Sequence, residues 1–150
     1  MGIMQTYIGQ LLPMILTVMK KIQIEEDDDD DEWGVPNSCA CLLNVIAKLM
    51  GDAILASILE EVSGGITSTK WLDKYSALMI FGSVLSGPTP QYAAQTITPA
   101  MGTLLTAFKD QSHKVRETTA WMFSKLVQDQ FELVANAPEV FNQLIHNAYD

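Results

Sequence analysis

The strongest candidate for binding chemistry is a run of eight consecutive acidic residues, Glu25 to Glu32, which Trp33 follows directly. Outside this run, ten Asp and Glu face nine Lys and Arg, so the run carries nearly the whole net charge of −9. Adjacent like charges repel one another and favour an exposed, extended conformation. Carboxylates beside an indole can capture a Lys- and Arg-rich peptide through charge attraction and cation–π stacking. The alternative interpretation is a solvated linker, the usual role of such runs.

The remaining candidates for catalysis or metal binding are weak. Gly64–Gly65 is expected to end a helix and does not form a phosphate loop, and the two histidines have no paired nucleophile. Cys39 and Cys41 stand two apart on a predicted helix, so their side chains face different directions and cannot readily bridge. A zinc site would need two further ligands, and the acidic run lacks the spacing and glycine of an EF-hand. We therefore expect no enzyme activity, no catalytic residues, no metal and no cofactor.

Length and composition narrow the class of protein. The chain has 150 residues, 48% of them hydrophobic, which is enough for one domain or a short repeat array. The acidic charge balance argues against nucleic acid or an anionic membrane surface as partners. No apolar run reaches about 18 residues, so no transmembrane helix is expected, and no signal peptide is evident. Reduced thiols in the cytosol or nucleus are the expected state of the cysteines.

Apolar residues at helical spacing predict a series of helices joined by short connections, with no strand pattern. The expected helices cover residues 5–24, 39–50, 53–62, 68–85, 91–109 and 113–130, and a further one opens at 136–138. Pro13 should bend or interrupt the first helix, and Pro99 repeats this internal proline in the fifth. The glycines at Ser63–Gly65 should break the third.

A weak internal repeat organises these helices. Residues 46–49, 81–84 and 123–126 share one pattern of large apolar, small, small or polar, and aliphatic residues, at offsets of 35 and then 42. The small residue of each segment, Ala47, Gly82 or Ser124, stands where a neighbouring helix would have to approach closely. A period near 40 with two helices per unit is typical of HEAT and armadillo repeats, and the alternative is an ordinary helical bundle.

We therefore predict an all-α, armadillo-like HEAT-repeat superhelix of about three and a half helical pairs. Its expected units are residues 5–50 with the acidic loop at 25–33, then 52–86, 90–130, and the first helix of a further repeat at 138–150. Met79, Phe81 and Phe123 are expected in the core between repeats, and Trp71 is expected to pack or cap. Both ends should present apolar patches, and these should make the chain prone to self-association.

Several segments together resemble the importin-β family of nuclear transport receptors, also called karyopherin-β. They are DDDDDEW, CACLLNVIAKLMGD, WLDKYSALMIFGSVLSGP, ITPAMGTLLTAFKD and VRETTAWMFSKL, and the resemblance covers nearly the whole chain. It implies a role in protein import, with localisation in cytoplasm, nucleus and nuclear pore. The implied partners are the basic helix of importin α or basic cargo, Ran-GTP, and nucleoporins with Phe-Gly repeats, which enter clefts between outer helices. It further implies a fragment that lacks the repeats on either side.

The resemblance also implies which residues bind partners. The family's acidic loop and its closing tryptophan match Asp27, Asp28, Asp29, Asp30, Asp31, Glu32 and Trp33. Trp121 matches a concave-face tryptophan that stacks on basic side chains, and Glu117, one turn earlier, matches an acidic position. Periodicity alone leaves core packing open for Trp121. The alternative function is a structural HEAT scaffold or adaptor in which the acidic loop only aids solubility.

Overall fold

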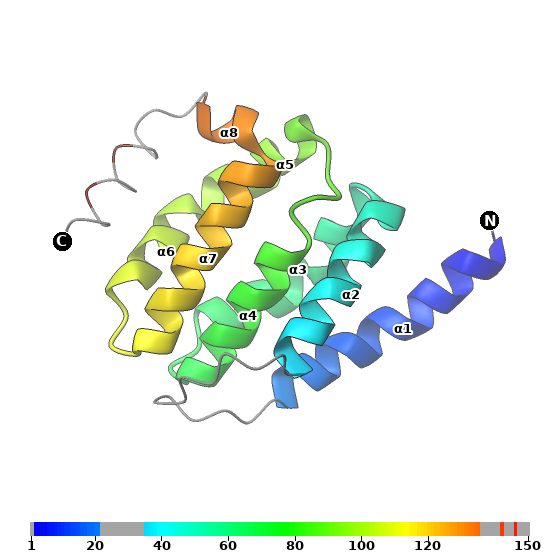
Figure 1. Ribbon diagram of the computed structural model, residues 1–150, viewed down its shortest axis with the longest axis horizontal. Helices are drawn as coiled ribbons and strands as arrows, with labels where there is room; N and C mark the ends of the chain where they lie inside the picture. The colour runs from blue at the N-terminus through cyan, green and yellow to red at the C-terminus, as the bar shows by residue number, and fades with distance from the viewer. Residues whose placement is uncertain (1, 22–34, 136–141, 143–145, 147–150) are drawn as a thin grey trace.

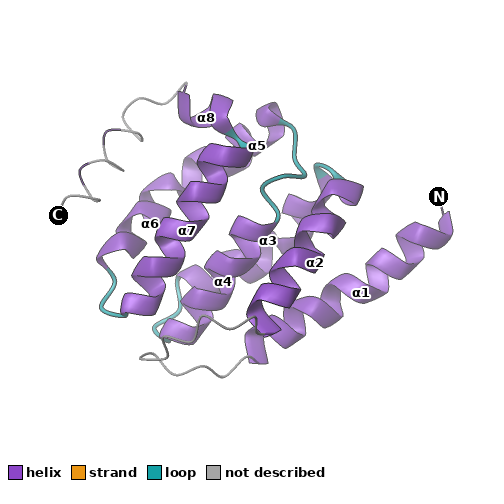
Figure 2. Ribbon diagram, viewed as in Figure 1, coloured by secondary structure: helices purple, strands orange, loops and turns teal. Residues whose placement is uncertain are grey.

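The computed structural model describes residues 2–21 and 35–135, together with 142 and 146, and this part of the chain is helical with short turns and no strand (Figure 2). The all-α prediction is confirmed. The elements in chain order are α1 (Gly2–Lys21), α2 (Val35–Met50), α3 (Ala53–Ile66), α4 (Trp71–Ser83), α5 (Pro90–Ile97), the 3₁₀ turn η1 (Thr98–Ala100), α6 (Met101–Thr106), the 3₁₀ turn η2 (Ala107–Lys109), α7 (His113–Asp129) and α8 (Phe131–Ala135).

The helices form two layers. In Figure 1, α2, α4 and α7 run side by side, and α4 packs against both of its neighbours. Behind them, α1 packs on α2 and α4, α3 packs on α4, and η2 joins the α5–α6 segment to α7. Each helix of the α2–α4–α7 layer is therefore backed by a helix that precedes it in the chain, and contacts form mainly between neighbouring pairs.

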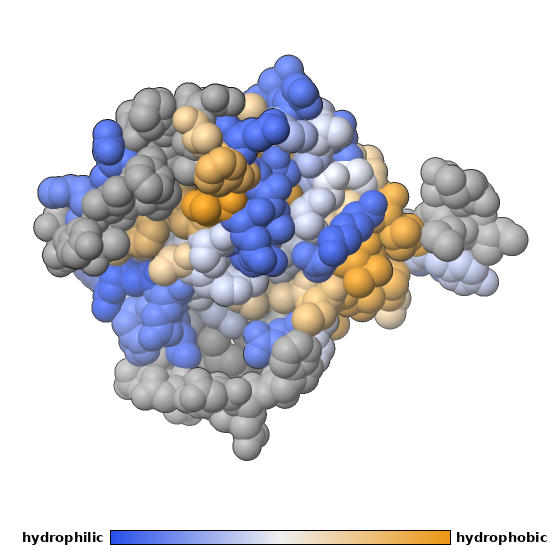
Figure 3. Space-filling model, turned by 45° about the horizontal axis from the view of Figure 1, so that its top comes forward, coloured by the Kyte–Doolittle hydropathy of each residue, from blue (hydrophilic) through white to orange (hydrophobic). Residues whose placement is uncertain are grey.

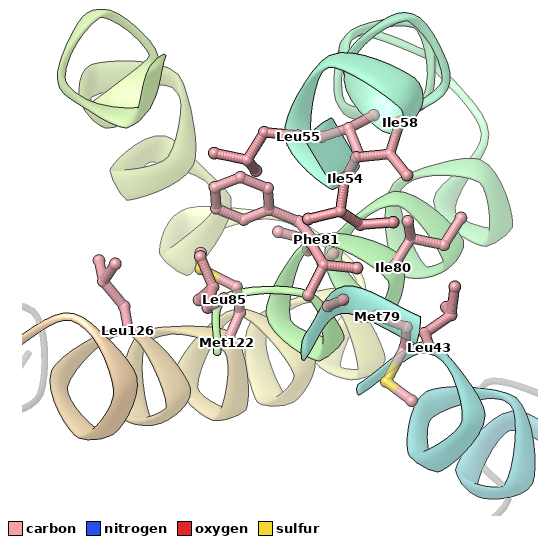
Figure 4. Packing of buried hydrophobic residues seen from close by; sticks show 14 of the residues in the cluster. Leu43, Ile54, Leu55, Ile58, Met79, Ile80, Phe81, Leu85, Met122 and Leu126 are labelled. Atoms are coloured by element: carbon pink, nitrogen blue, oxygen red, sulfur yellow. The ribbon is translucent and has the colours of Figure 1, made fainter. Parts of the chain in front are cut away.

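The core is centred on α4, and the chain is buried from Tyr75 in this helix through Leu85 in the turn that follows it. Figure 4 shows Ile80 and Phe81 of α4 lying near Ile54 and Leu55 of α3, and the Met122 side chain of α7 near Leu85. The three residues expected in the core between repeats, Met79, Phe81 and Phe123, are all buried, as predicted. Trp71 is half-buried at the start of α4 and meets Tyr75 edge to face, so its predicted packing role is confirmed.

Polar contacts hold the turn after α4, residues 85–89, from both sides. Asn44 Nδ2 of α2 donates to the Ser86 hydroxyl at 3.1 Å. The backbone amide of Thr89 donates to Asp52 Oδ1 at 2.6 Å. From the other side, buried Gln130 donates through Nε2 to two turn carbonyls at 2.7 and 2.9 Å. Gly87 lies against the backbone of α2, where a side chain would collide. The turn therefore fixes the spacing of three successive helical pairs.

The prediction that Ser63–Gly65 breaks the third helix is wrong, because α3 continues through both glycines to Ile66. A Cβ atom on Gly65 would lie 2.6 Å from Cβ of Ala77 and 2.8 Å from the carbonyl oxygen of Asp73. Glycine therefore permits the close approach of α3 to α4 at this point. The next helix starts later than expected, at Trp71, and the Ser68 hydroxyl before it donates to the Asp73 carboxylate at 2.7 Å.

The two internal prolines behave differently. Pro13 does not interrupt α1, which is one continuous helix from Gly2 to Lys21, and the Thr17 hydroxyl donates to the Pro13 carbonyl at 2.8 Å. Pro99 lies in η1, and this 3₁₀ turn separates α5 from α6. The C-terminal region also differs, since α8 occupies residues 131–135, where no helix was expected. The start predicted at 136–138 lies outside the described residues.

Candidate partner-binding surface

The acidic loop, Asp27 to Glu32 with Trp33, lies outside the residues that the structure describes, so its geometry stays a prediction. Its described neighbours are Lys21 at the end of α1 and Val35 at the start of α2. Figure 1 shows both of these points at the same end of the molecule as the N-termini of α4 and α7. The acidic segment is thus attached at the end where the helices of the α2–α4–α7 layer begin.

Trp121 of α7 is held against α4 by a glycine. A Cβ atom on Gly82 would lie 2.5 Å from Cζ3 of the Trp121 ring, with two further ring atoms at 3.1 and 3.2 Å. The indole therefore rests on the bare backbone of α4, yet it stays partly exposed. The close helix approach predicted at the small repeat positions is confirmed for Gly82. At Ala47 the close neighbour is Gly87 of the turn after α4, and Ser124 is exposed and donates to the Trp121 carbonyl.

Glu117 and the Trp121 indole lie on the same side of α7. Glu117 lies four residues before Trp121, which places the two side chains on one face of the helix. Glu117 is exposed, as are Ala120 and Ser124 on the same side. The structure therefore brings together the two site residues predicted on α7, an aromatic ring and a carboxylate, on a surface open to solvent.

A second polar cluster ties α4 to the turn before α7. Lys74 Nζ donates to Asp110 Oδ2 at 2.6 Å, and Arg116 Nη1 donates to the carbonyl oxygens of Asp110 and Gln111. Burial opposes ionisation of Asp110, but the hydrogen bonds from Lys74 and the Ser112 amide, with the charges of Lys74 and Arg116, lower its pKa. These side chains connect successive helical pairs, so we assign them a structural role.

The cysteines are free thiols, half-buried at Cys39 and exposed at Cys41, and burial raises the pKa of the Cys39 thiol. Among the described residues, no group of three His, Cys, Asp or Glu is arranged to hold a metal ion. Within the described part of the chain, no helix combines the length and apolarity needed to span a membrane.

The resemblance implies clefts between outer helices, but no residue pattern assigns their lining. Two clefts lie in the layer behind α4. A groove of about 690 Å³ separates α1 from α3. It is lined by Ile8, Gly9, Leu12, Pro13, Leu16, Thr17, Leu49, Met50, Ala53, Ser57, Glu60 and Glu61. The only sequence signal for this α1–α3 groove is a glycine and a proline spaced by one helical turn.

The second cleft is smaller, about 150 Å³, and lies between α3 and the α5–α6 segment. Its walls are mostly apolar, from Leu59, Val62, Ile66, Phe81, Ala100 and Leu104, with Ser63, Thr67, Thr96 and Thr103 as polar residues. No single residue pattern predicts this α3–α6 cleft, because it forms between segments about 40 residues apart in the chain.

Comparison with known proteins adds family information. Residues 71–126 match the family model of the HEAT-like repeat. Importin subunit beta-1 of Saccharomyces cerevisiae is 32% identical over 85% of this chain, which corresponds to 14% of that relative. The chain therefore spans about one seventh of the length of this curated relative.

Solved structures agree with this similarity. One match, with a TM-score of 0.82, is a chain of Kap95p, which is yeast importin-beta. In that structure, Kap95p binding induces the switch loops of RanGDP to adopt the GTP-bound conformation. The two are 30% identical, and the match covers 93% of this chain and 16% of that one. A chain of the Kap95:Nup1 complex matches with a TM-score of 0.78 at 30% identity, over 86% of this chain and 15% of that one.

Proposed function

Because this chain is a HEAT-repeat segment of the importin-β family, we propose that it is part of a nuclear import receptor and binds basic, importin-α-type helices or basic cargo. The observation that carries the proposal is a pair on one face of α7, the partly exposed indole of Trp121 and the exposed carboxylate of Glu117. The acidic run at 25–32 supplies long-range attraction for such a partner. Function in the cytoplasm, the nucleus and the nuclear pore follows from this proposal.

The packing of Trp121 suits it to hold a cation. An Arg or Lys over the face of an indole is attracted by about 0.5–2 kcal/mol, depending on how far the contact is desolvated. Gly82 already holds the ring against α4, so little side-chain freedom remains to be lost on binding. Glu117, one turn away, offers a charge to the next basic side chain of a helical ligand.

Ran-GTP and nucleoporins are further proposed partners. The matching Kap95p structures include one with RanGDP and one with Nup1. We assign Ran-GTP to the acidic loop, whose negative charge suits a basic surface. We assign Phe-Gly repeats to the α3–α6 cleft, because its mostly apolar wall and volume of about 150 Å³ suit one aromatic ring.

Titration with a synthetic Arg- and Lys-rich helix at two ionic strengths tests the main proposal. Trp121→Ala should weaken binding by roughly 2- to 30-fold without changing its salt dependence, because no formal charge is lost. Replacing Asp27 to Asp31 by Ser should weaken binding and flatten the salt dependence, with little effect on folding stability.

Trp71→Ala is the matched tryptophan control, since this indole is half-buried at the start of α4 and packs on Tyr75. It should leave affinity near the wild-type value. If the basic helix does not bind, or if both Trp121→Ala and the loop replacement bind it as wild type does, the chain acts as a structural scaffold and the proposal is wrong.

A further inference from the structure

The outer side of the α1–α2 pair carries two stripes of exposed apolar side chains. Along each stripe the spacing alternates between four and three residues, as the a and d positions of a coiled coil do. We call this surface the α1–α2 face, and its members are Tyr7, Leu11, Met14 and Val18 of α1 with Leu42, Val45 and Leu49 of α2. Figure 3 shows an apolar patch on this side of the molecule. Side chains at this spacing are suited to interlock with those of another helix.

The α1–α2 face is large enough for a specific contact. Its seven side chains are each 36–65% exposed, and together they leave on the order of 600 Å² of accessible surface per copy. A patch of this size is at the upper end of what monomeric proteins expose. Two copies that met through these side chains alone would bury about 1,200 Å², which is the lower limit for specific protein interfaces. The area of the face therefore matches what a weak dimer needs.

The charge distribution favours this face for contact between copies. The chain has a net charge of −9, so two copies repel one another at most approaches. Helices α1 and α2 contain no Asp or Glu, and their charged residues are Lys20, Lys21 and Lys48. All 18 acidic residues lie elsewhere in the chain. Two copies therefore meet with the least repulsion between carboxylates when they approach through the α1–α2 face.

We propose that the α1–α2 face is the interface of a two-fold symmetric dimer of this chain. Each copy contributes the same two helices, so the contact is a four-helix bundle whose core is built from the two pairs of stripes. A two-fold contact closes with two copies. Packing of the face on the α8 end of another copy, where Phe131 is exposed, would instead continue into a filament. The inference uses neither Trp121 nor the acidic loop, so it does not rest on the proposed function.

Sedimentation velocity of the 150-residue chain measures the association directly. Over about 5–500 μM the sedimentation coefficient should rise from that of a monomer to that of a dimer and no further, with a Kd of roughly 10–100 μM, because the buried area is small for a specific interface. At the low-micromolar concentrations used for unfolding measurements the chain is then monomeric, with the α1–α2 face exposed as in the structure.

Met14→Glu and Val45→Glu each place a carboxylate within one of the two stripes. Both side chains are more than half exposed in the single chain, at 63% and 53%, so helix content by circular dichroism should stay unchanged. Two-fold symmetry puts two copies of each new charge into one interface, so either variant should raise the Kd at least about tenfold. Phe131→Glu is the matched control, because it makes the same change of charge at a 65% exposed side chain on α8. It should dimerise with the wild-type Kd.

The salt dependence of the wild type distinguishes apolar contact from charge attraction. Raising NaCl from about 20 mM to about 300 mM screens the repulsion between two chains of net charge −9, so the dimer should become roughly two- to tenfold tighter. Attraction between the acidic loop of one copy and lysines of another would respond in the opposite direction. Trp121→Ala should associate as the wild type does, because its indole lies on α7, outside the α1–α2 face.

Three results would overturn the inference. One is a chain that stays monomeric up to about 500 μM. Another is a dimer that salt weakens, or that both Met14→Glu and Val45→Glu leave intact. The third is growth beyond the dimer that Phe131→Glu abolishes, since the α1–α2 face would then pack on the α8 end of the next copy.

Discussion

Helices α4 and α1 are both rich in apolar residues, yet only α4 is enclosed. From Tyr75 to Leu85 every side chain of the α4 region is buried, because α2, α3 and α7 pack around it. In α1, one stripe is buried, while Tyr7, Leu11, Met14 and Val18 remain exposed. Apolarity alone therefore does not decide burial; the number of neighbouring helices does. We expect α4 to contribute more to stability than α1 does.

The exposed side of α1 continues onto α2. Leu42, Val45 and Leu49 are exposed at helical spacing, and Figure 3 shows an apolar patch on the side of the molecule that carries α1 and α2. The apolar surface predicted at this end is therefore present. At the other end the described Phe131 is 65% exposed, and the residues that follow Ala135 are mostly outside the described part. Self-association through these surfaces remains a prediction for sedimentation analysis.

The largest expected effect comes from truncating a side chain in α4. Leu78 is 1% exposed, so Leu78→Ala should lower the free energy of unfolding by about 2–5 kcal/mol through lost burial and a cavity. Met14→Ala in α1 removes a side chain that is 63% exposed and should change stability by less than about 0.5 kcal/mol. Urea unfolding monitored by circular dichroism measures both. Equal losses would show that α1 is enclosed in solution and would remove the contrast between the two helices.

A smaller effect is expected from the contact of α4 with α7. Gly82→Ala forces a methyl group into the Trp121 ring, and such overpacking should destabilise the chain by about 1–3 kcal/mol. In a Trp121→Ala background the obstruction is gone, so the same substitution should become neutral or stabilise α4 by about 0.5–1 kcal/mol. This change of sign in a double-mutant cycle distinguishes steric contact from a general intolerance of α4.

Gly102→Ala provides the control for helix propensity, because nothing lies within 4 Å of its Cβ position. It should stabilise the chain by up to about 1 kcal/mol in either background. A loss of stability on Gly82→Ala that persists without the indole would mean that the ring is not what requires glycine at this position.

These cases also show what the sequence can and cannot predict. The helical periodicity and the small residue at Gly82 are local signals, and both correspond to what the structure contains. In the sequence Gly64–Gly65 resembles a helix end. The structure needs glycine at Gly65 because α4, whose residues lie farther along the chain, approaches closely there. The groove beside Pro13 depends on how far α1 diverges from α3, which no residue pattern within either helix encodes. The sequence patterns therefore do not indicate which helices pack against one another, or how closely.

The smallest expected effect concerns the tie between α4 and the turn before α7. The pKa of Asp110 is lowered in the folded chain, although burial opposes this, because Lys74, the Ser112 amide and Arg116 favour the carboxylate. A group whose pKa is lower when folded stabilises the fold above its unfolded value of about 3.9, and this stabilisation is lost as pH falls through the folded value. Wild type should therefore exceed Asp110→Asn in stability at pH 7 by about 1 kcal/mol, because the Lys74–Asp110 ion pair is only partly buried.

Urea unfolding at pH 7, 5, 4 and 3 tests the direction of this effect. The difference between wild type and Asp110→Asn should stay constant from neutral pH down to about 5 and then shrink below about 4, because only the wild type loses a favourable ionised group. Lys74→Met should weaken the same pH dependence, since it removes the ammonium that donates to Asp110 at 2.6 Å. Lys48→Met, on the exposed side of α2, is the matched control and should leave the dependence unchanged. A difference that is the same at pH 7 and pH 3 would mean that the aspartate acts only through its shape and its neutral hydrogen bonds. The link between successive helical pairs would then depend on packing alone, as it does where Trp121 meets Gly82.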